Sequence, residues 1–346
     1  MFTAFLKKYT AFIACNCIVL SAGAQANVEV VKSATEPKVA VTIGGKPFTT
    51  LMFPDTLEKP VLYPIYAADG QLITRGYPIM PRQGDPTDHP HHIGLWLNYE
   101  SVNGLDFWNN SFAIPADKKH LYGWIRTDNI LETRSGKKGV LTYSAHWDDM
   151  QKNVLLKEVT TFVFSGDAHH RIIDRTTTLT AMQTVLFKDA KDGMMGLRVA
   201  HELQLPDTTT KKFTDDKGNV TIVKGDAGTT GNYITSEGKT GNSAWGTRAT
   251  WCMLYGKEGN DTISVAIIDH PKNVGYPAYW HARDYGLFAV NPLGQKIFSN
   301  GSQTLNFTLQ KDSSVTFRYR IVINAGDKRL SNSEVVKMAN DFGKME

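Results

Sequence analysis

The strongest constraint on the fold is the regular alternation of apolar and polar side chains over residues 315–323. The apolar positions are Val315, Phe317, Tyr319, Ile321 and Ile323, and the polar positions are Thr316, Arg318 and Arg320. Successive side chains of a strand point to opposite faces, so a period of two predicts a half-buried strand. Such a strand is typical of an antiparallel sheet with one face on the core.

Similar strand-like segments recur along most of the chain. Gly44-Gly45 separates residues 38–43 from residues 46–53, and a Gly-Gly pair between two such runs predicts a hairpin. Further apolar or alternating segments cover residues 61–67, 140–147, 154–164, 171–179, 184–187 and 304–309. Many short strands at close spacing favour an all-β protein over an α/β protein.

One helix is predicted, close to the C-terminus. Ser331 and Glu334 have the spacing of a capping box and precede the apolar residues 335–339. We therefore expect a large antiparallel β-sandwich with one C-terminal helix on its outside. The galactose-mutarotase-like supersandwich is one architecture of this kind. We expect a single domain over residues 27–346, with two long loops at 83–119 and 206–246.

The N-terminal residues 1–26 have the pattern of a secretory signal peptide. Lys7 and Lys8 precede the mostly apolar residues 9–20, and residues 24–26 fit a cleavage site between small residues. This predicts a periplasmic or secreted protein with no membrane span after cleavage. A lipoprotein anchored at Cys15 is the alternative, which the preceding residues fit poorly.

Charge and cysteine content narrow the possible partners. The formal charge is +4, and loss of Lys7 and Lys8 with the signal leaves 4 − 2 = +2, so nucleic acid is not expected as a partner. Of the three cysteines, only Cys252 lies outside the signal, so no internal disulfide is expected. Cys252 lies in an apolar segment and is interpreted as a buried structural thiol.

Residues 88–92 are the strongest candidate for chemistry. They place Asp88 directly before His89, His91 and His92. Histidine serves as general acid, general base or metal ligand near neutral pH. Pro90 favours an extended backbone, on which His89 and His91 would point the same way. The alternative is a chance cluster on an exposed loop.

Four other clusters carry possible binding residues. Trp280-His281 with Arg283 precedes an apolar segment, although a single histidine in such a place is often a buried structural one. Residues 103–110 combine aromatic rings with amides and a carboxylate, as sugar subsites do, and a well-packed loop is the equal alternative. Residues 187–203 place Arg198 among apolar side chains, where it should have an anionic partner. The last cluster is residues 243–249.

These motifs resemble the PmoA-like family of secreted bacterial proteins of unknown function. The resemblance covers about residues 39–323 and rests on the segments 88–96, 102–108, 187–198, 245–249, 269–271 and 280–288. The family name refers to a methane monooxygenase subunit, which would be an integral membrane protein. The resemblance instead implies a secreted β-sandwich protein similar to sugar-acting proteins. The chain departs from the family at Ile93, where members often carry arginine.

The leading hypothesis is an exported carbohydrate-active enzyme that performs glycoside cleavage, elimination or epimerisation. Its substrate would be an oligosaccharide or another small polar molecule. The predicted catalytic residues are Asp88, His89, His91, His92 and His281. The predicted substrate-binding residues are Arg75, Arg82, Trp96, Asn103, Asp106, Trp108, Lys188, Asp189, Arg198, Trp245, Arg248, Asp269, His270, Arg283 and Tyr285.

Two alternatives remain open. A divalent metal ion could be bound by His89, His91 and His281, a spacing that permits a site without requiring one. No other cofactor is indicated. The second alternative is a non-catalytic glycan-binding protein on the same fold. The leading hypothesis and the metal hypothesis share one geometric requirement, which is that these three histidines lie within reach of one small ligand.

Overall fold

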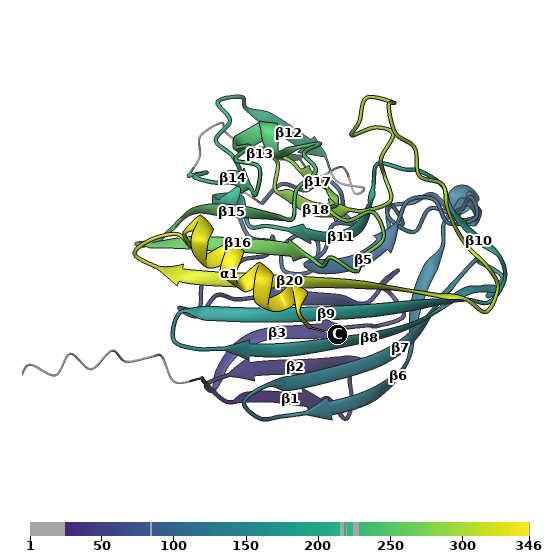
Figure 1. Ribbon diagram of the computed structural model, residues 1–346, viewed down its shortest axis with the longest axis horizontal. Coiled ribbons are helices and arrows are strands. Elements are labelled where there is room, and N and C mark those ends of the chain that lie inside the picture. Colours follow the sequence, from purple (N-terminus) through teal and green to yellow (C-terminus); the bar gives the residue numbers. More distant parts are fainter. Residues whose placement is uncertain (1–24, 84, 215–217, 219, 224–227, 346) are drawn as a thin grey trace, which may run out of the picture.

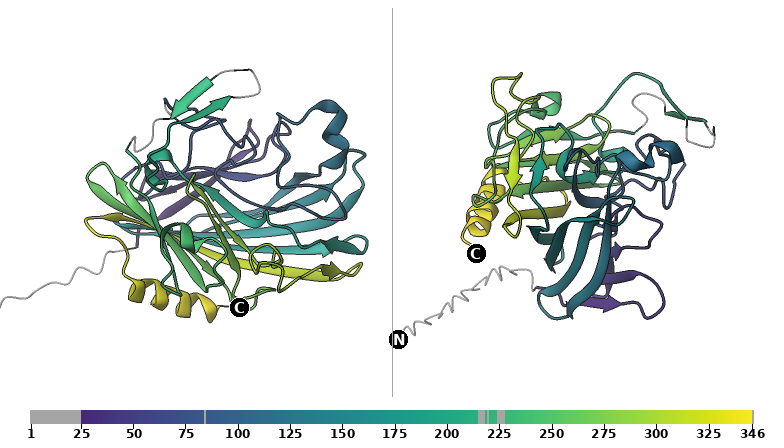
Figure 2. Two further views of the ribbon diagram at one scale, coloured as in Figure 1. Left: turned by 90° about the horizontal axis from the view of Figure 1, so that it is seen from above. Right: turned by 90° about the vertical axis from the view of Figure 1, so that its right-hand side faces the viewer.

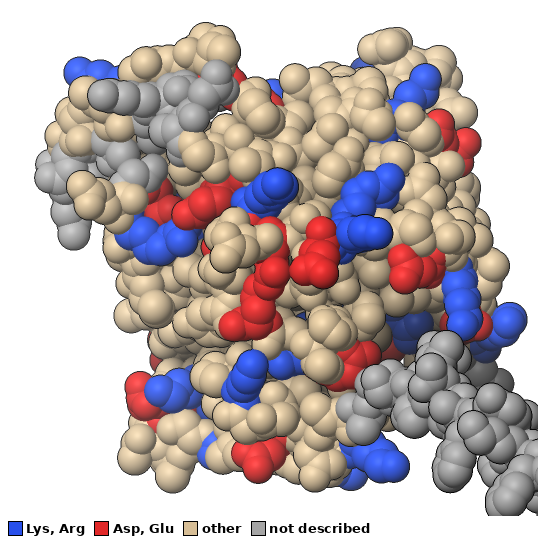
Figure 3. Space-filling view, turned by 90° about the vertical axis from the view of Figure 1, so that its left-hand side faces the viewer, with Lys and Arg blue, Asp and Glu red and all other residues tan. Residues whose placement is uncertain are grey.

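The computed structural model describes residues 25–345 except 84, 215–217, 219 and 224–227. The predicted signal peptide, apart from its last two residues, lies outside the described residues. Among these residues, no helix is long and apolar enough to cross a membrane. On the face shown in Figure 3, basic and acidic side chains are interspersed.

Two eight-stranded antiparallel sheets form the body of the protein (Figures 1 and 2). The first sheet has the order β1 (Val28–Lys32), β2 (Lys38–Ile43), β3 (Lys46–Met52), β4 (Val61–Ile65), β5 (Leu95–Tyr99), β11 (Gly193–Arg198), β18 (Leu287–Asn291) and β17 (Tyr279–Ala282). The second has the order β14 (Asn232–Thr235), β15 (Trp251–Glu258), β16 (Asp261–Asp269), β20 (Ser314–Gly326), β9 (His170–Ala181), β8 (Val154–Gly166), β7 (Gly139–Asp148) and β6 (Trp124–Arg134).

The remaining strands and the 3-10 helices are short. Strand β10 (Val185–Phe187) pairs with β19 (Phe307–Leu309), and β12 (Lys211–Thr214) pairs with β13 (Val220–Val223). Three short 3-10 helices are η1 (Ala116–Leu121), η2 (His201–Leu203) and η3 (Gly241–Ala244). The β2–β3 hairpin turns at Gly44 and Gly45, both with positive φ, as predicted.

The main hydrophobic core lies between the two large sheets and draws side chains from both of them. Strand β20 shows how the alternating sequence builds it. Phe317, Tyr319 and Ile321 are buried in this core, while Thr316 and Arg318 on the other face are partly exposed. Burial of alternate residues removes apolar surface from water without burying the polar ones. The predicted all-β class with large antiparallel sheets is confirmed.

Helix α1 (Asn332–Gly343) covers the outer face of the second sheet (Figure 1). Its capping box is present, because the Ser331 hydroxyl accepts from the backbone N–H of Glu334 while the Glu334 side chain accepts from the N–H of Ser331. Val335 and Phe342 pack on Met253 and other apolar residues of this face. The position and capping of the one predicted α-helix are therefore confirmed.

The two segments predicted as long loops contain strands. Residues 83–119 include β5, a central strand of the first sheet, and residues 206–246 include β14 as well as the β12–β13 hairpin. All five residues of β5 are buried, so its sequence lacks the alternation of a half-exposed strand. The prediction of structureless segments was wrong for this reason.

The outer face of the first sheet carries the candidate site. Trp96 of β5 is aligned with Gly196 of β11, which is aligned with Ala289 of β18, and Ala289 is aligned with His281 of β17. Residues aligned in neighbouring strands point to the same face. The four side chains therefore form a row across the sheet, with two small residues between an indole and an imidazole.

Candidate functional site

Gly196 is required at the centre of this row. A Cβ atom built there would lie 2.5 Å from one atom of the Trp96 ring and 2.9 Å from one atom of the Trp108 ring. The two indoles pack on each other with centroids 5.1 Å apart and close over the glycine. Both are almost fully buried, so Trp96 and Trp108 support the site from below and do not form the sugar-stacking walls expected of them.

The carboxylate of Asp88 joins three charged or titratable side chains. Its Oδ1 lies 2.8 Å from Nη1 of Arg75 and 2.8 Å from Nη2 of Arg198, and its Oδ2 bonds Nδ1 of His89. Burial alone would raise the pKa of Asp88, but Arg198, the hydrogen bond from His89 and Arg75 together hold it well below its usual range. Asp88 is therefore a carboxylate at neutral pH.

Arg75 holds the backbone of the histidine segment. Its guanidinium donates to the carbonyl oxygens of Pro86, Asp88, His89 and His92 at 2.7–3.1 Å. Arg75 and Arg198 are both fully buried, and the anionic partner expected for Arg198 is Asp88. Both arginines are occupied within the protein and position the segment, in place of the substrate contacts predicted for them.

The bond to Asp88 fixes the orientation of His89. Because an ionised carboxylate only accepts hydrogen bonds, Nδ1 of His89 carries the proton and Nε2 is the free acceptor of a neutral ring. The His89 side chain is 41% exposed, so it is the member of the histidine segment that a ligand can reach. His89 has a φ of 46°, a left-handed conformation that costs a non-glycine residue free energy and persists where surrounding contacts impose it.

His89 belongs to a column of stacked rings. It lies parallel to Tyr285 at 5.2 Å and to His92 at 4.8 Å, and His92 in turn stacks on Trp96 at 5.2 Å. The guanidinium of Arg198 lies 4.9 Å from the centroid of the Tyr285 ring. Stacking on both sides fixes the plane of the His89 ring, which the Asp88 bond alone would leave free to tilt.

His91 and His92 are buried beneath His89. Burial lowers the pKa of both imidazoles well below the usual value, with nearby Lys59 and Arg198 among the further causes, so both are neutral. Their Nε2 atoms have no hydrogen-bond partner among the described residues. Lys59, whose own pKa burial lowers to about 8, donates to the carbonyl of His91 at 2.8 Å. These two histidines are packed inside the protein, unlike His89.

His281 meets a carboxyl group that the sequence reasoning missed. Its Nδ1 lies 3.3 Å from Oδ1 of Asp192, the residue before β11. Burial lowers the pKa of His281 to about 3, so it is neutral. Burial raises the pKa of Asp192 to about 6, with Lys191 opposing the shift and Glu100 adding to it. The position of Asp192 directly before Gly193, at the start of the apolar strand that ends in Arg198, could have indicated its role from the sequence.

The two histidine clusters lie on one face, as predicted. His281 lies in the same row across the sheet as Trp96, and His92 stacks both on Trp96 and on His89. The Tyr285 hydroxyl has its pKa raised to about 12 by burial, opposed by Arg198 and Arg283, and then raised by Asp192 and Asp88. The Tyr285 ring stacks on His89 and lies within 5.5 Å of the guanidinium groups of Arg198 and Arg283, which places it beside the Asp88–His89 pair. Of the predicted trio, His91 and His281 are both buried, and only His89 is exposed.

The metal site considered for His89, His91 and His281 is not formed by these side chains. Within the described part of the chain, no group of three His, Cys, Asp or Glu side chains is arranged to hold a metal ion. His89 and His91 have ring centroids 5.6 Å apart and meet edge to face.

Several other predicted binding residues fix loops. Asn103 accepts from the N–H of Leu186 and donates to the carbonyl of Thr184, and both oxygens of Asp106 accept hydrogen bonds from Asn109. Arg248 donates to the carbonyls of Gly275, Tyr276 and Pro277, and Arg82 pairs with Glu202 at 2.8 Å. These hydrogen bonds and this ion pair are internal to the protein, so few donors and acceptors of these side chains are left for a substrate.

Asp269 and His270 lie at a different place. The Asp269 carboxylate accepts from Asn273 and from the N–H groups of His270 and Ala278. The His270 ring packs on Phe342 of helix α1 at 5.0 Å. They hold the chain beneath the helix, so the structure does not bring them to the site. Lys188 is exposed on the surface.

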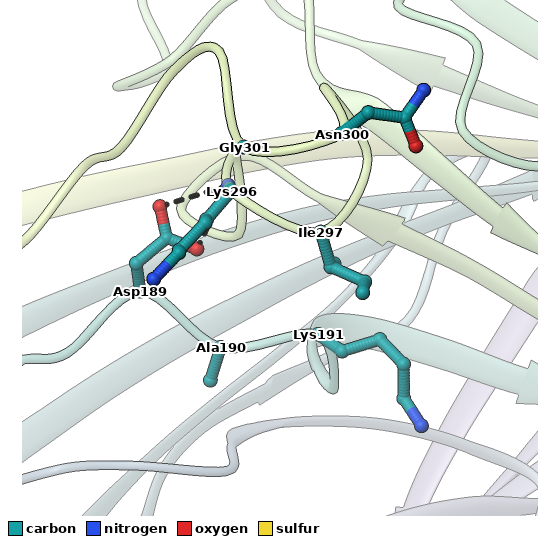
Figure 4. Close-up of a pocket in the computed structure, with 7 residues that line it drawn as sticks. All are labelled: Asp189, Ala190, Lys191, Lys296, Ile297, Asn300 and Gly301. Carbon is teal, nitrogen blue, oxygen red and sulfur yellow. Dashed lines mark hydrogen bonds between the residues drawn. The ribbon is translucent and has the colours of Figure 1, made fainter.

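Two pockets large enough for a sugar ring lie beside the outer face of the first sheet that carries His89 and His281 (the histidine face). One, of about 360 Å³, is lined by Asn242, Trp245, Ala282, Arg283 and Asp284. The other, of about 350 Å³, is lined by Asp189, Ala190, Lys191, Lys296, Ile297, Asn300 and Gly301 (Figure 4). Their volumes lie at the lower end of the range for small-molecule sites.

Fold and site together define an all-β protein of two large antiparallel sheets with a histidine and carboxylate site on the outer face of one sheet. The chain belongs to a family of unknown function, DUF6807, whose model matches residues 38–340. No curated protein sequence matches it. The resemblance to PmoA-like proteins is not tested by this match and stays a prediction.

Solved structures with similar sheets include sugar-acting enzymes. The GH36 alpha-galactosidase AgaB from Geobacillus stearothermophilus has a TM-score of 0.37 and 10% identity, over 86% of this chain and 41% of that chain. A beta-arabinopyranosidase has a TM-score of 0.29 and 13% identity, over 87% and 38% of the two chains. The Slr1438 protein from Synechocystis sp. PCC 6803 has a TM-score of 0.28 and 9% identity, over 87% and 96%.

The chain thus spans about two fifths of the length of the two enzymes. At these TM-scores and identities the likeness carries no argument about activity. The chemistry has to be argued from the residues of this chain.

Proposed function

We propose that the protein is an exported carbohydrate-active enzyme that moves protons on a sugar substrate. The observation that supports this most directly is the His89 imidazole, held at Nδ1 by an ionised Asp88 and open at Nε2. A carboxylate that orients an imidazole in this way produces a general base. Export is supported by the signal-like pattern of residues 1–26.

Asp192 supplies a complementary acid. With a pKa of about 6 it keeps a protonated fraction near neutral pH, and its side chain is 14% exposed. In an elimination, His89 Nε2 would take a proton from a sugar carbon, a C=C bond forms as the neighbouring C–O bond breaks, and protonated Asp192 gives its proton to the leaving oxygen. In an epimerisation, His89 would take the same proton and Asp192 would return one to the opposite face of that carbon. Substrate loses one proton and gains one, and solvent then restores both groups. Tyr285, protonated because of its raised pKa, would donate a hydrogen bond between them.

A reaction in which the substrate loses one proton and gains another favours epimerisation or elimination over glycoside hydrolysis. A conventional glycosidase places two carboxyl groups across the scissile bond. Here the outward-facing pair is an imidazole and one carboxyl, because the Asp88 carboxylate is already bonded by Arg75, Arg198 and His89. The reaction class is therefore proton abstraction with assistance from an acid.

The test is an oligosaccharide panel assayed with the wild type, His89→Ala and Asp192→Asn. Nuclear magnetic resonance of the products would separate epimers, unsaturated sugars and new reducing ends. We expect turnover of at least one glycan and its loss in both variants. His169→Ala, which removes an exposed histidine at a turn, is the matched control. The absence of turnover on every glycan, or full turnover by His89→Ala, would contradict the proposal.

A further inference from the structure

Arg283 forms no ion pair with another residue in the described part of the chain. It follows β17, is half-buried, and its guanidinium lies 5.5 Å from the centroid of the Tyr285 ring. Within the described part of the chain, its side chain has no hydrogen bond or carboxylate partner, whereas Arg198 is paired with Asp88. A partly buried arginine is ordinarily paired, and its planar fork matches a carboxylate or a sulfate.

The pocket beside Arg283 is suited to a sugar ring. Trp245 is half-exposed in this pocket, and Asn242 adds an amide. The indole Nε1 of Trp245 is buried and has no acceptor among the described residues. Asp284 also lines the pocket, with one carboxylate oxygen accepting from the N–H of Tyr285. An aromatic face with a few polar groups is the usual composition of a saccharide subsite.

The second pocket is also lined by cations. Lys191 and Lys296 border it together with Ile297 (Figure 4). Its one carboxylate, Asp189, accepts hydrogen bonds from the backbone N–H groups of Gln295 and Lys296 at 3.0–3.1 Å and of Leu305 at 2.7 Å. The Lys296 ammonium has no ion pair in the described chain. Asp189 therefore holds the loop, and the Lys296 charge faces solvent without a partner.

Phe298 connects the two pockets to the histidine face. Its ring meets Trp245 of the first pocket at 5.4 Å and His281 at 5.8 Å. It belongs to the loop that lines the second pocket, between Ile297 and Asn300. His281 also neighbours Asp192, which pairs with Lys191 of the second pocket at 3.4 Å. Both pockets are thus next to His281, and the second is also next to Asp192.

We infer that the substrate is an anionic saccharide, with a carboxylate or sulfate group paired to Arg283 in one pocket and a second anionic unit near Lys296 in the other. This rests on the proposed function, because the pockets are assigned as subsites of that same site. Unpaired cations on either side of the histidine face select charged sugar units, since each neutral analogue leaves a cation without a partner.

Calorimetric titration tests the selectivity directly, with sodium glucuronate, glucose 6-sulfate and glucose as probes. We expect at least one anionic probe to bind at least tenfold more tightly than glucose, and the two anions to show whether carboxylate or sulfate is preferred. Arg283→Gln should reduce that preference at least fivefold, and Lys296→Gln should reduce it further in the double variant. Lys311→Gln, which removes an exposed lysine from a turn, should preserve it.

Equal binding of glucose and both anions, no binding of any probe, or a preference retained by the double variant would overturn the inference. The proposed function fails on a different measurement, which is full glycan turnover by His89→Ala. An enzyme that turns over only neutral glycans, with His89 required, would keep the proposed function and remove the anionic substrate. The charge of the preferred probe therefore tests the anionic substrate, and the turnover by His89→Ala tests the proposed function.

Discussion

The Asp88 carboxylate bonds Nδ1 of the adjacent His89 through one oxygen, while its other oxygen lies 2.8 Å from both Arg75 and Arg198. A single carboxylate therefore orients the exposed imidazole and forms ion pairs with two buried guanidinium groups. The first role concerns catalysis and the second concerns stability, and substitutions can separate them.

Replacing Asp88 with asparagine should affect both roles. The amide can no longer stabilise a positive imidazole, so kcat should fall by roughly 10²–10⁴-fold, as for an orienting aspartate in a catalytic triad. The two arginines lose their counter-charge, so the melting temperature should also fall. His89→Ala should lose activity with a small change in stability, because its side chain is 41% exposed. Steady-state kinetics and calorimetry would check this, with Asp312→Asn as the surface control.

The pH profile should report Asp192. Its folded-state pKa is raised to about 6, so the proton that it donates is present at low pH and is lost as pH rises through about 6. The profile of kcat/KM should therefore decline above pH 6 on its alkaline side. Asp192→Asn should lower the rate and abolish that decline. An alkaline limit that is unchanged in this variant would exclude Asp192 as the acid.

Substitution of Arg75 should loosen the histidine segment. Lysine keeps the charge but cannot donate to four carbonyl groups and a carboxylate at once. We expect Arg75→Lys to lower the free energy of unfolding by about 2–4 kcal/mol, because two or more hydrogen bonds are lost at about 0.5–1.5 kcal/mol each and buried carbonyl groups are left without donors. Amide exchange in residues 86–92 should accelerate. Arg134→Lys, at an exposed ion pair, should change stability by less than about 0.5 kcal/mol.

Asp269 should prove structural. Its carboxylate satisfies the N–H groups of His270 and Ala278 and the amide of Asn273. Asp269→Ala leaves three buried donors without acceptors, at about 1–3 kcal/mol each. We therefore expect a large loss in denaturant midpoint while the remaining folded protein keeps its kcat. A specific loss of kcat at full stability would instead return Asp269 to the candidate site.

The sequence predicted the elements that have one face on the core. The β2–β3 hairpin, strand β20 and the capped helix α1 were all visible from local patterns. Strands β5 and β14 were placed within loops. Strand β5 is buried on both faces, so its residues show no alternation, and periodicity alone cannot distinguish such a segment.

The candidate site shows the same division. The acid and histidines of residues 88–92 and His281 were recognised from residue type, because few side chains titrate near neutral pH. The sequence did not predict which of these histidines is exposed. His89 is exposed, whereas His91 is buried. Asp192 was not among the predicted site residues, and Trp96, predicted to bind substrate, is fully buried.

The sequence by itself determined the all-β class, the C-terminal helix and the residue types of the site, because hydrophobic period, capping and titration are local properties. Only the tertiary structure decided that Asp88 meets Arg198, that Asp192 meets His281, and which histidine reaches solvent. Those relations depend on strand order and on burial. Burial sets the charge of Asp192 and the neutrality of His281, and it follows from packing across distant segments of the chain.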